Sequence, residues 1–324
     1  MTRLGYTPFQ EEWWLEATAP GHWDAVEIER GGQVQARLPF VITERDGFRI
    51  LGQPSLTQSL GPWVLDTGAG YTRTLSREMS LYKELIERLP QHDVFKQHFA
   101  PQVTNWLPFY WEGFTQTTRY TYTLSLEQPL NAIWQGMDKK NRARARKAAD
   151  KLAITKSTDG DLETLLDMSE LTFRRQGREL PYTRDFVRRL DAAILKNSSR
   201  LIVVARDPES GRPHAANYTF GDQHRTYALM SGADPELRHS GASVAARWEA
   251  IGWAHGFSQV FDFEGSMVEG IEHRNRSYGA RQLPYFSMGR SNGKLEAYDR
   301  RKRRRRAPLL VAWRLKERAL KPFR

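Results

Sequence analysis

The sequence predicts a mixed α/β (α+β) fold of two tandem units, each a mixed but mainly antiparallel sheet flanked by helices. Three observations support this prediction. Alternating strand patterns separated by Gly-containing turns occur in both halves. Helical spacing of apolar residues appears between them, at 74–89, 162–175 and 184–196. A weak likeness between GQVQARLPFVI (32–42) and GRPHAANYTFG (211–221) indicates that the second unit repeats the order of the first.

In the first unit, strands are expected at 23–30, 33–42, 48–52, 94–99 and 118–126. Gly31-Gly32 and Arg45-Asp46-Gly47 are typical hairpin turns between the first three. Residues 130–151 contain seven basic side chains among strong helix formers, which favours one helix that bridges the two units. We interpret its charges as a solvated face rather than a site.

In the second unit, strands are expected at 200–206 and 214–220 around a turn at 208–211. The next strand, 227–233, leads through a Ser/Gly loop into an amphipathic helix and then to a strand that ends in carboxylates. A helix near 268–278 and a strand near 281–288 follow. The predicted divisions are a first domain (1–129), the bridging helix (130–152), a second domain (153–290) and a basic amphipathic tail (291–324).

Composition narrows the chemistry. The chain has 324 residues, of which 40% are hydrophobic, and it contains no cysteine, which excludes thiol nucleophiles, disulfides and thiolate metal sites. Histidines show no metal-binding spacing, so we predict no metal. The sequence shows neither a run of about 18 apolar residues nor a signal-peptide core. We therefore expect a cytoplasmic protein.

The formal net charge of +11 is concentrated at one end of the chain. Residues 300–324 hold twelve Lys or Arg and one acid, so the rest of the chain is neutral. Leu309, Leu310, Trp313 and Leu320 supply an apolar side to this basic segment. Three interpretations stay open: attachment to an anionic membrane at its inner face, binding of tRNA phosphates, and a disordered solubilising tail. We do not expect DNA as a partner.

The loop at 238–243 is a candidate anion site. Arg238, His239, Ser240, Gly241, Ala242 and Ser243 directly precede a helix, where free backbone N–H groups and the helix dipole favour a phosphate. The alternative is an ordinary helix start with Ser240 as its cap.

Asp262 and Glu264 are the candidate catalytic carboxylates. They are two residues apart on a predicted strand, so both are expected on the same face. Two neighbouring carboxylates raise the pKa of one of them, as a base near neutral pH requires. We favour Glu264 as the base or amine-binding group, and Asp262 has an open structural alternative.

Several segments together resemble the GNAT superfamily of acyltransferases, and the whole chain resembles its FemAB-like branch of tandem GNAT domains. They are the basic run 139–144, LTFRRQG (171–177), SGAD (231–234), the loop 238–243 and FDFEGSMVEGIEHRNRSYGA (261–280). The loop has the Arg and first Gly of the GNAT pyrophosphate pattern, with Ser243 in place of Gly or Ala. Asn275 stands where a general-acid Tyr is common in GNAT enzymes, and Tyr278 lies nearby.

The resemblance implies transfer of an acyl group from acyl-coenzyme A, with acetyl-coenzyme A the first candidate, to an amine acceptor of the cell envelope or a related metabolite. It implies donor binding by Ser231, Arg238, Ser240, Gly241, Ala242 and Ser243, and acceptor binding by Arg175, Gln176, Tyr227 and Ser266. For Arg175 and Gln176, compensation of a helix dipole is the alternative.

Two other functions stay open at this point. In the Fem ligases the donor is aminoacyl-tRNA, which would make the protein a peptidoglycan-type aminoacyl ligase. The third is a non-catalytic adaptor that uses its tail to reach a membrane or RNA and retains only the acyltransferase fold.

Overall fold

The computed structural model describes residues 3–295 and 297–298, so residues 299–324 of the predicted basic tail lie outside the described residues. The elements of the first half are β1 (Arg3–Leu4), η1 (Pro8–Gln10), α1 (Glu12–Thr18), β2 (Trp23–Arg30), β3 (Gln33–Arg45), β4 (Phe48–Gly52), β5 (Trp63–Leu65), α2 (Tyr71–Glu87), β6 (Val94–His98), α3 (Leu107–Trp111) and β7 (Thr115–Ser125).

The elements of the second half are α4 (Leu130–Gly136), α5 (Lys139–Lys151), β8 (Ala153–Ser157), α6 (Leu162–Arg175), α7 (Arg184–Asn197), β9 (Ser199–Arg206), β10 (Pro213–Gly221), β11 (Arg225–Ala233), η2 (Arg238–Ser240), α8 (Ala242–His255), β12 (Val260–Asp262), α9 (Glu269–Arg276) and β13 (Arg281–Ser291). Nearly every predicted strand and helix is present with ends shifted by a few residues.

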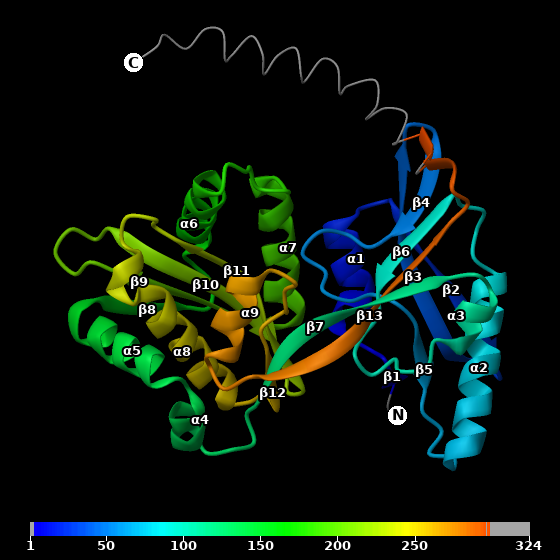
Figure 1. Ribbon diagram of the computed structural model, residues 1–324, viewed down its shortest axis with the longest axis horizontal. Helices are drawn as coiled ribbons and strands as arrows, with labels where there is room; N and C mark the ends of the chain where they lie inside the picture. The colour runs from blue at the N-terminus through cyan, green and yellow to red at the C-terminus, as the bar shows by residue number, and fades with distance from the viewer. Residues whose placement is uncertain (1–2, 296, 299–324) are drawn as a thin grey trace, which may run out of the picture.

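One continuous sheet runs through both halves (Figure 1). Its strand order is β1-β5-β3-β4-β6-β13-β7-β12-β11-β10-β9-β8, with β2 paired to β3. Only β4–β6 and β11–β12 pair in parallel among these strands, so the predicted mixed, mainly antiparallel sheet is confirmed.

The last strand, β13, crosses from the second half into the first. Ser287 pairs with His98 of β6 on one side and with Thr117 of β7 on the other. Hydrogen bonds of the sheet thus join the two predicted domains, and the division at residue 129 stays a prediction.

Helices cover both faces of the sheet in the second half (Figure 1). Helices α6 and α7 pack Leu165 and Leu190 against one face, and α8 packs Ala246 and Ala250 against the other. The N-terminal segment joins the first of these layers, because Phe9 packs edge-on to Tyr227 with ring centroids 4.8 Å apart. No pattern in the sequence predicts that long-range contact.

In the first half, the apolar core lies between the sheet and helix α2. Helix α2 buries Leu81 and Leu85 with Phe40 and Phe95 of the sheet. None of the helices in the part of the chain that the structure describes is long and apolar enough to span a bilayer.

The bridging helix is a correction to the sequence-based expectation. It is two helices, α4 and α5, because Met137 has extended backbone angles (φ −69°, ψ 149°) and Asp138 caps the start of α5. The break turns α5 back along α8 instead of across the two halves.

Strand β11 and helix α6 approach each other more closely at Gly232 than any side chain permits. A Cβ at Gly232 would lie 2.2 Å from the backbone carbon of Met168 and from the backbone nitrogen of Ser169. This contact fixes the distance between α6 and the strand that lines the site described below.

We therefore expect Gly232→Ala to lower the free energy of unfolding by about 1–3 kcal/mol, since backbone must move to admit the methyl group. Gly252→Ala on α8 is the matched control, because a Cβ there meets nothing within 4 Å. That variant should be neutral or more stable by about 0.5–1 kcal/mol. Urea unfolding of both variants measures the difference, and equal stabilities would contradict the close packing.

Candidate functional site

The loop at 238–243 leads into the N-terminus of α8 and lies beside α5. Residues Arg238–Ser240 form a short 3₁₀ turn, and Gly241 has a left-handed backbone with φ 82°. A Cβ at Gly241 would lie 2.6 Å from the carbonyl oxygen of Arg144, so the position combines two requirements for glycine. Ser240 Oγ accepts a hydrogen bond from the N–H of Ala242 at 3.3 Å.

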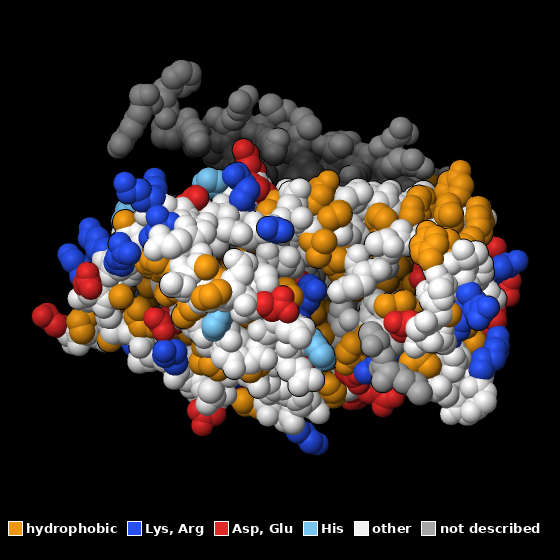
Figure 2. Space-filling model, turned by 90° about the horizontal axis from the view of Figure 1, so that it is seen from below, with side chains coloured by type: hydrophobic (Ala, Val, Ile, Leu, Met, Phe, Trp, Pro, Cys, Tyr) orange, Lys and Arg blue, Asp and Glu red, His pale blue; other side chains and the backbone are white. Residues whose placement is uncertain are grey.

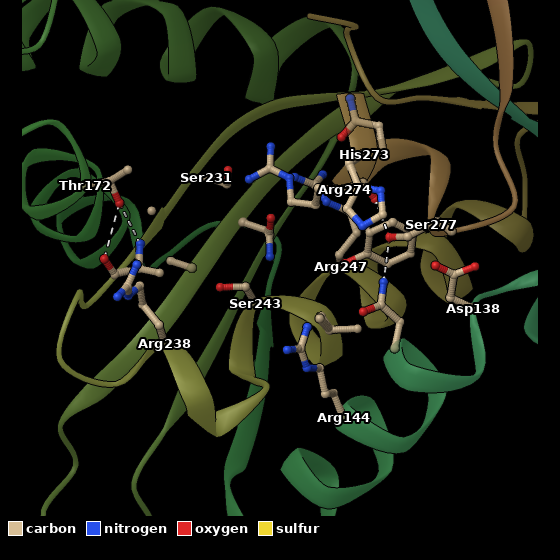
Figure 3. Close-up of a pocket in the computed structure, with 18 of the residues that line it drawn as sticks. Asp138, Arg144, Thr172, Ser231, Arg238, Ser243, Arg247, His273, Arg274 and Ser277 are labelled. Atoms are coloured by element: carbon tan, nitrogen blue, oxygen red, sulfur yellow. Dashed lines mark hydrogen bonds between the residues drawn. The ribbon is translucent and has the colours of Figure 1, made fainter. Parts of the chain in front are cut away.

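A cavity of about 390 Å³ lies beside this loop, between α5, α6, β10, β11, α8 and α9 (Figure 3). Ser231 and Gly232 of β11 line it together with Arg238 and Ser243 of the predicted loop. Ser240, Gly241 and Ala242 adjoin these lining residues and position them. The expected donor-site residues are thus brought together at one cavity.

Most charged side chains around this cavity are cations. They come from α5, α6, the loop, α8 and α9, and they are Lys140, Arg144, Arg175, Arg238, Arg247 and Arg274. Asp138 is the single carboxylate residue of the lining, and His273 adds a further titratable group. No ion pair links any of the six to a carboxylate of the described residues. An unneutralised cluster of this kind favours an anionic ligand.

Arg247 is the buried member of the cluster. It is 8% exposed, its Nη1 is enclosed without a hydrogen-bond partner, and it lies 6.0 Å from the ring centre of Phe261. The pKa of its guanidinium is lowered to about 10, mainly by burial; Arg274 also lowers it, whereas Tyr278 and Glu264 raise it. Arg247 therefore stays protonated at neutral pH. Figure 3 shows it directed into the centre of the cavity, near Arg274.

Glu264 does not lie on the predicted strand. Strand β12 ends at Asp262, and Glu264 follows with a left-handed backbone (φ 52°) that non-Gly residues rarely adopt. The expectation that both carboxylates project from one strand face is therefore wrong. Glu264 Oε1 is enclosed without a hydrogen-bond partner.

The environment of Glu264 makes its carboxyl a strong proton acceptor. Burial raises its pKa well above the ordinary value, and the charge of Asp262 raises it further, whereas Arg247 lowers it. This direction agrees with the sequence-based expectation, although burial is the larger cause. Such a carboxyl is suited to take a proton near neutral pH.

Asp262 is held by structural partners instead. Its side chain, 2% exposed, forms an ion pair with Arg225 (2.7 Å) and accepts hydrogen bonds from Thr121 Oγ1 (2.6 Å) and Gln58 Nε2 (3.4 Å). It also accepts the N–H of Glu264 at 2.9 Å. With its oxygens occupied, Asp262 fits the structural alternative and serves to position Glu264.

The four expected acceptor-binding residues are dispersed. Arg175 lines the cavity, whereas Gln176 is exposed at the end of α6. Ser266 Oγ accepts the N–H of Val268 at 3.0 Å outside the cavity lining. Tyr227 is wrongly assigned, because it is 3% exposed in the core, stacked on Phe220 at 5.4 Å.

Sequence reasoning missed the contribution of α5 and α9. Lys140 and Arg144 of α5 line the cavity, so the interpretation of that helix as a solvated face was wrong for this side. Asn141 Nδ2 donates to Ser277 Oγ at 2.6 Å and ties α5 to the end of α9. Tyr278 is buried in the wall of the cavity, and burial raises its pKa, so its hydroxyl stays protonated.

A second hollow of about 660 Å³ lies over the sheet of the first half. Gln53, Lys96, His98 and Arg119 line it, and burial with Arg119 as a second cause lowers the pKa of His98 to about 4. Tyr285 of β13 borders these residues. Its ring lies 5.7 Å from that of His98, and its hydroxyl accepts from Arg119 Nε at 3.2 Å.

Burial is the main cause of the raised pKa of Tyr285; Arg119 opposes it, and the charges of Asp262 and Glu264 add to it. Arg247 of the first cavity lowers the pKa of Glu264.

Comparison with known proteins identifies the fold. Residues 138–270 match the model of an acetyltransferase (GNAT) domain. The second half carries a GNAT domain. The match includes the loop 238–243, Arg247 and Glu264, so these residues lie in a domain of the GNAT fold. None of the curated protein sequences matches the chain.

Solved structures show the same architecture across both halves. A crystal structure of FemX matches with a TM-score of 0.66 at 12% identity, over 88% of this chain and 97% of FemX. A tandem GNAT protein from the clavulanic acid biosynthesis pathway matches with 0.55 at 12% identity, over 85% of each chain. L-PGS from Bacillus licheniformis gives 0.52 at 12% identity, over 82% of this chain and 83% of L-PGS. The expected tandem-GNAT, FemAB-like fold is confirmed.

The two carboxylates lie in different environments, so replacing each by its amide should change stability differently. Asp262→Asn should lower the free energy of unfolding by about 3–5 kcal/mol, because it leaves Arg225 buried and unpaired. Glu264→Gln should leave the protein folded at neutral pH. Chemical denaturation of both variants tests this, and a stable Asp262→Asn protein would remove the structural role of Asp262.

The raised pKa of Glu264 also predicts a pH-dependent stability. The folded state binds the proton more tightly than the unfolded state, so the associated stability is complete below the unfolded pKa of about 4.3 and is lost as pH rises through the folded pKa. Glu264→Gln removes this loss. The variant should therefore gain stability relative to the wild type as pH rises from 4 to 8. A difference that is constant over this range would show that Glu264 is not perturbed.

Proposed function

We propose that this protein is an N-acyltransferase that moves an acyl group, with acetyl as the first candidate, from acyl-coenzyme A to an amine of a cell-envelope precursor, polysaccharide or related metabolite. The observation that carries the proposal is the cavity at the N-terminus of α8, with six unneutralised cations in a GNAT domain. The phosphates of a coenzyme A donor supply the anions that this lining lacks.

The residues present fit such a donor. Gly241 lets the carbonyl of Arg144 approach the start of α8 more closely than a side chain would allow, which holds α5 beside the loop. Arg144 and Arg238 extend from opposite sides of this point in Figure 3. We assign the phosphates to these groups, and the reactive end of the donor to the deeper part of the cavity near Tyr278.

The donor supplies a thioester carbonyl, which an amine attacks directly, forming an N–C bond as the C–S bond breaks. Glu264 takes the proton of the amine, for which its buried, proton-attracting carboxyl is suited. Tyr278 stays protonated and is placed to give a proton to the departing sulfur. The backbone N–H of Ser231 is the candidate donor to the carbonyl oxygen, since that of Ala233 already donates to Thr172 Oγ1 at 2.9 Å.

The acceptor approaches through the second hollow in this proposal. The open sheet face with Gln53, Lys96, His98 and Arg119 ends beside Tyr285, within electrostatic reach of Glu264. Each half of the fold therefore contributes one substrate site.

Calorimetric titration with coenzyme A and acetyl-coenzyme A tests the donor site. We expect saturable binding that weakens about 10- to 100-fold in Arg144→Ala and in Arg238→Ala, because each loses a charge-assisted contact to phosphate. Lys147→Ala is the matched control, since Lys147 is on the exposed side of α5 and outside the cavity lining. Glu264→Gln should keep donor affinity and lose turnover by about 100-fold or more.

No binding at millimolar coenzyme A would refute the acyl-coenzyme A assignment. It would favour the aminoacyl-tRNA donor or the non-catalytic adaptor, and full turnover in Glu264→Gln would remove that residue from the mechanism.

Aminoacyl-tRNA is the second candidate donor, favoured by the outer side of α5. Lys and Arg side chains gather over this end of the molecule (Figure 2), and the exposed ones of α5 are Lys139, Lys140, Arg144, Arg146, Lys147 and Lys151. The resemblance to Fem ligases implies the same donor. A tRNA titration distinguishes it, with affinity that falls steeply with salt and with deletion of residues 300–324.

A further inference from the structure

Two ionisable side chains near the proposed reaction centre, a guanidinium and a carboxyl, have no hydrogen-bonding partner among the described residues. Arg247 makes no hydrogen bond within the described residues, and neither carboxylate oxygen of Glu264 accepts one there. Each feels the charge of the other, yet they form no ion pair. A buried unpaired ion costs several kcal/mol, so proteins retain one mainly where a ligand pairs with it.

We propose that the acceptor carries a carboxylate as well as an amine, as an amino acid or a peptide end does, and that Arg247 binds the carboxylate while Glu264 receives the amine. This inference rests on the proposed function and names the acceptor class that it leaves open. A ligand with both charges satisfies both orphaned groups at once.

The position of Arg247 separates it from the donor phosphates. It lies five residues into α8 from Ala242, which is about 7.5 Å along the helix axis. Arg144 and Arg238, at the start of α8, remain for the phosphates. Arg247 instead borders Tyr278, with Phe261 beneath it, at the end of the cavity nearest Glu264.

The chemistry of a guanidinium suits this role. Its planar fork binds a carboxylate through two parallel N–H donors, and an amide offers no charge to pair with it. A site built around an ionic partner rejects the neutral analogue, because the buried cation is then left unpaired. The acceptor's amine proton passes to Glu264, the nitrogen bonds to the acyl carbon, and coenzyme A leaves as its thiol.

The test compares matched acceptors in the full-length protein at saturating acetyl-coenzyme A. The acceptors are a panel of free amino acids and short peptides and the corresponding C-terminal amides, with acylated products measured by mass spectrometry. We expect kcat/KM at least about 30-fold higher for an acid than for its amide. Arg247→Met should lower the value for the acid about 10- to 100-fold and leave the amide unchanged, and Arg247→Lys should retain part of the preference.

Three controls separate this role from a structural one. Arg247→Met should keep the coenzyme A affinity and should melt at the same temperature or higher, because it removes a buried unpaired charge. Glu264→Gln should slow acids and amides equally, so that the ratio between them stays fixed. Lys196→Ala, at an exposed position of α7 outside both hollows, should change neither value.

Equal rates for acids and amides, or no acylated acid while coenzyme A binds, would overturn the inference and leave the proposed function standing. Loss of coenzyme A binding in the wild type would refute the proposed function instead. In that case direct calorimetric titration with the acids decides the inference: binding that is absent in Arg247→Met supports it, and no binding overturns it.

Discussion

The buried carboxylate of Asp262 is the point on which the two halves and the site depend. It joins Arg225 of β11, Thr121 of β7 and Gln58 of the loop before β5. Asp262 is at the end of β12, the strand that links β11 of the second half to β7. An ion pair in this environment is stable only when its remaining oxygens and protons are also satisfied, as they are here. Asp262 also accepts the N–H of Glu264. The network that stabilises the sheet therefore also holds the turn that carries Glu264.

The close approach of this turn to β7 explains its sequence. A Cβ at Gly265 would lie 2.0 Å from the carbonyl oxygen of Tyr120, so only glycine follows Glu264. The strained backbone of Glu264 is therefore maintained by neighbours on both sides, which is typical of functional positions. The strain removes Glu264 from the sheet and leaves its carboxyl free to serve a ligand.

Sequence patterns predicted most helices and strands but not the geometry of the site. Alternation and turn residues located the hairpins, since these signals are local. The break between α4 and α5 was not visible, because Met137 and Asp138 are compatible with a helix, and only the packing of α5 on α8 requires the turn. The Asp262–Glu264 spacing suggested a shared face, but one positive φ is enough to break strand alternation. Tyr227 was misassigned since its main partner, Phe9, is more than two hundred residues away.

One residue of the cavity could have been predicted from the sequence pattern. Arg247 falls on a side of α8 that also carries Ala250, Ile251 and Ala254, all buried. A single Arg among apolar residues on a buried face indicates a functional charge, because charged side chains are rarely buried without a partner. The cations of α5 and α9 gave no comparable signal, since surface helices carry many such residues and only the fold shows which of them turn inward.

The tandem arrangement gives a physical reason for the long last strand. Without β13, strands β6 and β7 would each have an unpaired edge, and Tyr285 would not lie between His98 and Arg119. By pairing with both strands, β13 makes the sheet continuous across the two halves. It also places Tyr285, whose pKa the charge of Glu264 raises, beside the second hollow. The first cavity is built within one half of the chain, whereas the second hollow is lined by strands of the first half and by β13. In the proposed function, this division allows acceptor recognition to vary in the first half while the proposed donor cavity and Glu264 stay fixed in the second.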